Sequence, residues 1–171
     1  SVGPVRIVGT DKIETKDILA KLAIKRGATF SDHLIQDGIE QVTKLYHDKG
    51  YFFVSVKIDS FPTADNLADV VVRIIEGEKV GIENLKFNGN KTFTAKEIST
   101  QMEVKERGLL SWFDESGIYK KDNLRLDLLR IEAFYHDHGF LRVRVLEPQI
   151  EINKKKREMY ITIGIEEGVQ Y

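Results

Sequence analysis

Histidines and carboxylates are the residues of this chain whose types could do chemistry. His136 and His138 lie two positions apart near the expected end of a helix. They therefore do not share a helix face, as metal-binding histidines four positions apart would. A solvated histidine near the negative end of a helix dipole is the simpler interpretation. The sequence predicts no metal site and no bound cofactor.

Carboxylates are plentiful, but their pattern does not indicate catalysis. Asp114, Glu115, Asp137 and Glu167 include no acidic pair beside a nucleophile or a base. The glycines between 77 and 89 lack a phosphate-loop pattern. The absence of cysteine removes disulfides and thiolate catalysis. We therefore expect no enzyme and no catalytic residue, and a metal-dependent hydrolase stays as the alternative from another class.

Composition narrows the class of protein further. The 171 residues include 26 basic and 27 acidic side chains, which gives a net charge of −1. Such a balance disfavours a general nucleic-acid surface. No apolar run approaches the roughly 20 residues that span a bilayer, and no signal peptide is recognisable.

A repeat organises the chain. The sequence YHDKGY at 46–51 returns as YHDHGF at 135–140, and IVGT at 7–10 is answered by FNGN at 87–90. Such self-similarity indicates two copies of one module. We expect modules at 1–80 and 81–171, with an insertion in the second at about 105–118. The Glu-Gly that closes the first copy leads into the second, so we expect another module or domain after the second copy as well.

Each copy predicts the same order of elements. In the first copy a short strand at 5–8 precedes a helix. Ile13 and Ile18 form a hydrophobic staple at the start of that helix. In the second copy, Thr94 and Glu97 form a capping box at the equivalent helix start. A second amphipathic helix, begun at Ser31 in the first copy, ends at the glycine of the repeat.

A hairpin of alternating apolar residues follows the second helix. In the first copy it runs over 51–58 and returns over 70–74. In the second copy we expect Leu141, Val143 and Val145 to pair with Ile161, Ile163 and Ile165. The fold class is therefore α+β, with two tandem β-α-α-β-β modules, each a three-stranded mixed sheet with two helices on one face.

These ordered features resemble the POTRA module of the Omp85 family of outer-membrane proteins. The resemblance rests on the FNGN turn at 87–90, the helix-ending glycine followed by an aromatic residue, the Ser-Trp-Phe of the insertion at 111–113, and the closing Glu-Gly. It covers essentially the whole chain. It implies a non-catalytic scaffold at the periplasmic face of the bacterial outer membrane, in a protein anchored by a membrane barrel.

The resemblance also implies partners. These are unfolded outer-membrane β-barrel proteins, accessory lipoproteins, neighbouring POTRA modules and a C-terminal barrel; a periplasmic chaperone is a further candidate, and nucleic acid is not. Another transport-type Omp85 protein or a cell-division protein is the alternative carrier of such modules. The resemblance places the first hairpin strand at the sheet edge, where it could accept an added strand.

The predicted partner-binding residues lie on this edge and on the outer face of the sheet. A register error of one residue would exchange the two faces. The predicted set is Tyr51, Phe53, Ser55, Lys57, Val71, Ile75, Arg142, Val143, Arg144 and Val145.

Two further segments have open interpretations. The insertion residues Leu109, Leu110, Trp112 and Phe113 either cap their own core or contact a partner. The basic run Lys154, Lys155, Lys156 and Arg157 is either a solvated hairpin turn or a contact to an anionic membrane surface or an acidic loop.

Overall fold

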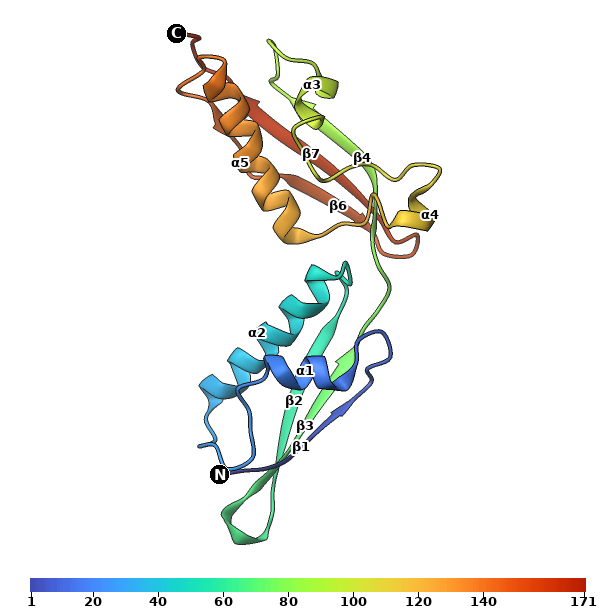
Figure 1. The fold of residues 1–171 in the computed structure, drawn as a ribbon, viewed down its shortest axis with the longest axis vertical. Coiled ribbons are helices and arrows are strands. Elements are labelled where there is room, and N and C mark those ends of the chain that lie inside the picture. Colours follow the sequence, from blue (N-terminus) through green and yellow to red (C-terminus); the bar gives the residue numbers. More distant parts are fainter. The chain divides into compact units, whose positions relative to one another are not determined.

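A computed structural model describes residues 1–171, apart from the side chain of Trp112. The chain divides into two compact units, Ser1–Glu78 and Lys79–Tyr171. Each unit has its own sheet and its own helices (Figure 1).

The first unit is a three-stranded mixed sheet with helices on one face. Its strand order is β1-β3-β2, with β1 parallel and β2 antiparallel to the central β3. Ile18, Val42 and Tyr46 of the two helices share a buried core with β3. In chain order the elements are β1 (Val2–Val8), α1 (Thr15–Lys21), α2 (Asp32–Asp48), β2 (Ser55–Pro62), the 3₁₀ turn η1 (Ala64–Asn66) and β3 (Ala68–Ile75).

Local chemistry sets the ends of these helices. Ser31 Oγ accepts from Leu34 N at 3.2 Å and begins α2. Gly50 ends it with a φ of 93°, a conformation that costs glycine little. In the second unit the predicted capping box of Thr94 and Glu97 is present, because each residue satisfies an amide of the other.

The second unit repeats the arrangement with additions. Its β4 is parallel to the central β7, and β5 and β6 follow one another along the opposite side of β7. A helical turn, α4, lies in the insertion. The elements are β4 (Gly81–Asn88), α3 (Ala95–Ser99), α4 (Ser111–Asp114), α5 (Lys121–Asp137), β5 (Arg144–Val145), β6 (Gln149–Asn153) and β7 (Glu158–Glu166). The predicted fold class is confirmed in both units.

The first hairpin strand of this unit differs from the predicted one, because it consists of the two short strands β5 and β6. Val145 of the predicted strand pairs with Ile165 of β7, but Ile161 pairs with Ile150 of β6 and not with a residue of the segment 141–145. Leu141 is 63% exposed outside the sheet. The strand breaks between β5 and β6 at Pro148, which has no amide for a ladder.

Candidate functional site

The edge strand β2 presents backbone groups that no neighbouring strand takes up. Ala68 N donates to Ser1 O at 3.0 Å, so the backbone groups of Ala68 face β1. Backbone direction alternates along a strand, so Asp69 and every second residue after it face β2. The register pairs these residues of β3 with Ser55, Lys57, Asp59 and Phe61, whose backbone groups therefore bond to β3. The residues between them, Val56, Ile58 and Ser60, turn their amides and carbonyls away from the sheet.

The second sheet has a shorter edge of the same kind. Leu146 N donates to Gly164 O at 2.9 Å, which shows that Gly164 faces the hairpin side. By alternation Thr162 bonds to β6 as well, and the register then directs the backbone groups of Ile150 and Ile152 outward. Their side chains are 39% and 40% exposed. The break at Pro148 limits this edge to β6.

The opposite sheet edges are partly covered. Val2 of β1 exchanges backbone bonds with Gly27 and Ala28, at 2.8 and 2.9 Å. Ile82 of β4 exchanges two bonds of 2.7 Å with residues of the insertion. Of the four edges, β2 therefore offers the longest outward ladder.

Two predicted residues of the outer face in the first unit do not lie on an exposed part of that face. Val71 lies in the central strand, opposite Arg6 of β1 and Asp59 of β2, and is only 2% exposed. Tyr51 packs edge-on against the buried Tyr46, with ring centroids 5.8 Å apart. The predicted strand alternation from Tyr51 is wrong for residues 51–54, because β2 begins only at Ser55.

The other predicted residues of this unit lie at the surface. Ile75 is 71% exposed at the end of β3. Ser55 and Lys57 are exposed on β2, and Phe53 is half-buried before it.

In the second unit, Val143 is the residue that the structure removes from the predicted contact set. Its side chain is 7% exposed and its amide donates to Phe140 O at 3.2 Å, so it belongs to the turn after α5. Arg144 is exposed and pairs with Glu166 at 3.1 Å. The remaining members are exposed or half-buried: Arg142 and Val145.

The insertion exposes apolar side chains. Leu109, Leu110 and Phe113 are 95%, 66% and 68% exposed, so the interpretation as a local cap is wrong for these three. The side chain of Trp112 lies outside the described residues. The basic run Lys154–Arg157 occupies the turn between β6 and β7, where both of its interpretations stay open.

His138, one of the two histidines that suggested a metal site, has a structural partner. His138 Nδ1 lies 2.7 Å from Phe134 O. Among the described side chains, no three His, Asp or Glu residues are grouped so that they could hold a metal ion. Within the same residues, no helix combines the length and apolar character that crossing a membrane requires.

The Glu of the closing Glu-Gly motif has a role that the sequence did not reveal. Tyr46 Oη donates to Glu76 Oε2 at 2.7 Å. The same carboxylate accepts from Asp11 N at 2.8 Å and from Lys12 N at 3.0 Å. We call this the Tyr–Glu pair; it joins the end of α2, the loop after β1 and the end of β3. Burial, together with the hydrogen bond to Glu76 and the charge of Glu76, raises the pKa of Tyr46 to about 12.

The second unit repeats the Tyr–Glu pair. Tyr135 Oη donates to Glu167 Oε1 at 2.9 Å, and Thr92 N donates to the same oxygen at 2.9 Å. Burial acts to raise the pKa of Glu167, but the hydrogen bonds from Thr92 and Tyr135 outweigh it and hold that pKa below its usual value. The sequence does carry a signal for this pair, because a tyrosine and a glutamate stand at equivalent positions in both copies.

Comparison with known proteins identifies the modules. The family model for POTRA, described as surface antigen variable number repeat, matches residues 1–77 and 80–168. The chain belongs to the POTRA family. Its two POTRA modules carry the free hairpin edges described above.

Curated relatives are assembly factors. The chain is 29% identical over 167 residues to the outer membrane protein assembly factor BamA of Nitratidesulfovibrio vulgaris, covering 96% of the chain and 21% of the relative. It is 21% identical over 174 residues to BamA of Neisseria meningitidis, covering all of the chain and 22% of that protein. The chain thus spans about a fifth of the length of these relatives.

Solved structures show the same fold. The crystal structure of POTRA3-5 of Haemophilus influenzae BamA matches 99% of this chain and 66% of that chain, with a TM-score of 0.64 at 12% identity. POTRA1-2 of Omp85 from Anabaena matches 99% of this chain and 96% of that chain, with a TM-score of 0.57 at 16% identity.

Proposed function

We propose that these POTRA modules are a non-catalytic scaffold of an outer-membrane assembly factor at the periplasmic face of the outer membrane. They receive unfolded β-barrel proteins and bind accessory subunits, in a full-length chain with further POTRA modules and a membrane barrel. The family match and the assembly-factor relatives support the setting. The outward backbone ladder of β2 is the observation that carries the binding mode.

An open backbone ladder suits a receptor for many substrates. Unfolded barrel strands share an alternating pattern but not a sequence, and backbone groups accept an added strand with little regard to its side chains. Ordering a flexible peptide offsets much of the gain, so we expect weak binding for each segment. Weak binding also allows the substrate to leave.

Proline at an outward amide tests this mode. Ser60→Pro removes a donor that faces away from β3, so the sheet keeps its own bonds. Ser60→Ala is the matched control, since it loses the same hydroxyl but keeps the amide. With a peptide from a barrel strand in an NMR titration, we expect Ser60→Pro to weaken binding about fivefold, as for the loss of one hydrogen bond.

The expected shifts lie along β2 and, more weakly, along β6. Equal affinity of Ser60→Pro and Ser60→Ala, with both variants folded, would remove the β2 edge as the receptor. Proline at 55 is not a useful probe, because the amide of Ser55 bonds to β3.

The insertion is the candidate contact for an accessory subunit. Changing Leu109 and Phe113 together to serine should leave the melting temperature nearly unchanged, because both side chains are exposed. We expect less lipoprotein subunit to co-purify with the full-length protein. Leu129 and Leu141, which are 59% and 63% exposed outside the insertion, provide the matched double serine control. Equal co-purification of both double variants would rule the insertion out.

A further inference from the structure

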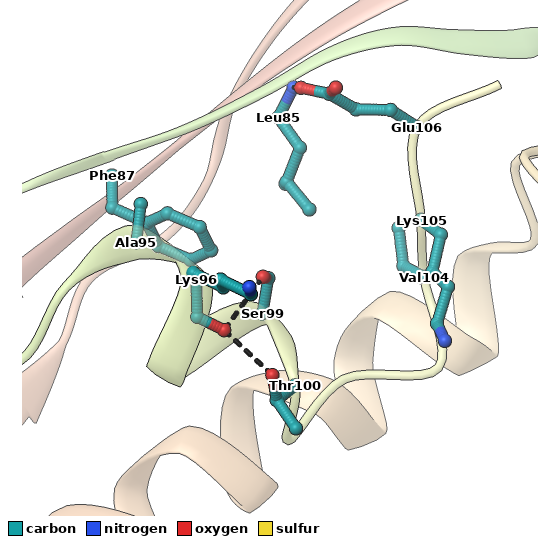
Figure 2. A pocket seen from close by; sticks show the side chains of 9 residues that line it. All are labelled: Leu85, Phe87, Ala95, Lys96, Ser99, Thr100, Val104, Lys105 and Glu106. Carbon is teal, nitrogen blue, oxygen red and sulfur yellow. Dashed lines mark hydrogen bonds between the residues drawn. The ribbon is translucent and has the colours of Figure 1, made fainter. Parts of the chain in front are cut away.

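A groove in the second unit lies apart from the hairpin edge. It runs between β4 and α3, and the segment 104–106 forms its other wall (Figure 2). Its volume is about 420 Å³. Figure 2 shows the side chain of Leu85 pointing into it, with Phe87 beside Ala95. The lining residues are Leu85, Phe87, Ala95, Lys96, Ser99, Thr100, Val104, Lys105 and Glu106.

A buried aspartate fixes the wall at its start. Asp127 of α5 is fully buried and accepts from Glu103 N at 2.9 Å and Val104 N at 2.8 Å. Arg130 Nη1 lies 2.6 Å from the same carboxylate. These bonds hold the wall in place where it leaves α3, so the groove is built by the fold rather than by a loose loop.

Glu106 covers the sheet edge inside the groove. Its Oε1 accepts from Leu85 N at 2.8 Å. That amide therefore faces away from β7, and by alternation the backbone groups of Phe87 face away as well. The carboxylate oxygen stands where the carbonyl oxygen of an added strand would accept. The side chain of Glu106 thus takes the hydrogen bond that an added strand would make to the outward edge of β4.

The rim of the groove is basic. Lys96 of α3 and Lys105 of the opposite wall both line it. Within the part of the chain that the structure describes, neither lysine forms an ion pair with a carboxylate. Two lysines beside an apolar floor favour a ligand that combines apolar side chains with negative charge.

The first unit has no carboxylate at the position that corresponds to Glu106. The offset of 80 between Gly9 and Gly89 makes Arg26 the counterpart of Glu106, and the neighbouring Ile24 and Val104 are buried in both units, at 3% and 5% exposure. A guanidinium has no acceptor for a backbone amide. The covering carboxylate is therefore a feature of the second unit alone.

We infer that this groove binds an extended acidic peptide segment. The peptide pairs with the outward backbone of Leu85 and Phe87, and its carboxylates lie at Lys96 and Lys105. Glu106 competes for the amide of Leu85 and must swing away when the peptide binds. This site is separate from the hairpin edges, and it does not depend on the scaffold function proposed above.

The test uses this 171-residue chain and a synthetic peptide, acetyl-Val-Asp-Val-Asp-Val-Asp-amide. In an NMR titration we expect shifts at 85–88, 95–100 and 104–106. Glu106→Ala frees the amide of Leu85 and should tighten binding about fivefold. Glu106→Gln removes the charge but keeps an acceptor oxygen, so its gain should be smaller. Changing Lys96 and Lys105 together to glutamate should weaken binding about tenfold.

Controls separate the groove from other surfaces. Arg26→Ala, at the equivalent place in the first unit, should leave the affinity unchanged, and a Val-Lys peptide of the same length should not bind. Equal affinity of wild type and Glu106→Ala, both folded by thermal melt, would overturn the inference, as would shifts confined to β2 or β6. If dihexanoyl phosphatidylglycerol moved these amides and the peptide did not, the ligand would be a lipid and the inference would be wrong.

Discussion

Gly9→Ala is expected to unfold the first unit at a much lower urea concentration than wild type. A Cβ at Gly9 would stand 2.0 Å from Ile74 O, a backbone atom of the central strand. Its φ of 88° adds the cost of a left-handed side-chain residue. Strain of 1–2 kcal/mol and overpacking of 1–3 kcal/mol give a loss of about 3 kcal/mol in the free energy of unfolding.

Gly27→Ala is the matched control in the same unit. Gly27 also has a φ of 88°, but a Cβ there would meet nothing within 4 Å. Only the conformational cost of about 1 kcal/mol remains. Urea denaturation, followed through the amide signals of each unit, measures both variants. Similar losses at the two positions would show that the contact with Ile74 does not govern the turn.

Glu76→Ala is expected to destabilise the first unit by about 3 kcal/mol. The change removes an acceptor that serves Tyr46 Oη and the amides of Asp11 and Lys12. Tyr46 is fully buried, so its hydroxyl loses its best partner where water cannot replace it. Glu76→Gln keeps one acceptor oxygen and should cost less. The same urea measurement, with the second unit as internal reference, would contradict this account if both variants matched wild type.

The Tyr–Glu pair also predicts alkaline sensitivity. The folded pKa of Tyr46, about 12, lies above its ordinary value near 10. A raised folded pKa means that the stabilisation is fully present below pH 10 and is lost as the pH rises through 12. Burial raises the pKa of Tyr135 in the same direction. We expect the free energy of unfolding of wild type to fall over this window, and Tyr46→Phe to flatten the fall in the first unit.

Local signals in the sequence were sufficient for the helices. The staple of Ile13 and Ile18, the cap at Ser31 and the capping box of Thr94 each involve residues within five positions, so spacing alone reveals them. The repeat fixed the order of elements in the same way. The parallel pairing of β1 with β3 could be expected because a helical crossover joins them.

The sequence was insufficient where long-range geometry decides. Alternation continues from Tyr51 into β2, yet Tyr51 N bonds to Tyr46 O at 3.0 Å and the chain is still turning. The register of β6 depends on the turn at 154–157 and on Pro148, which alternation over 141–145 does not contain. Glu76 and Asp11 are separated by 65 positions, so no local pattern could join them.

The buried Asp127 ties the segment that leads into the insertion to a single position of α5. Its counterpart in α2, 89 residues earlier like Gly50 to Gly139, is Gly38. Even a Cβ at Gly38 would lie 3.1 Å from the Cδ1 atoms of Ile24 and Ile58. An aspartate there would be crowded by both of these side chains. The duplicated modules are therefore no longer interchangeable, because the second unit holds residues 103 and 104 through a buried carboxylate for which the first unit leaves no room.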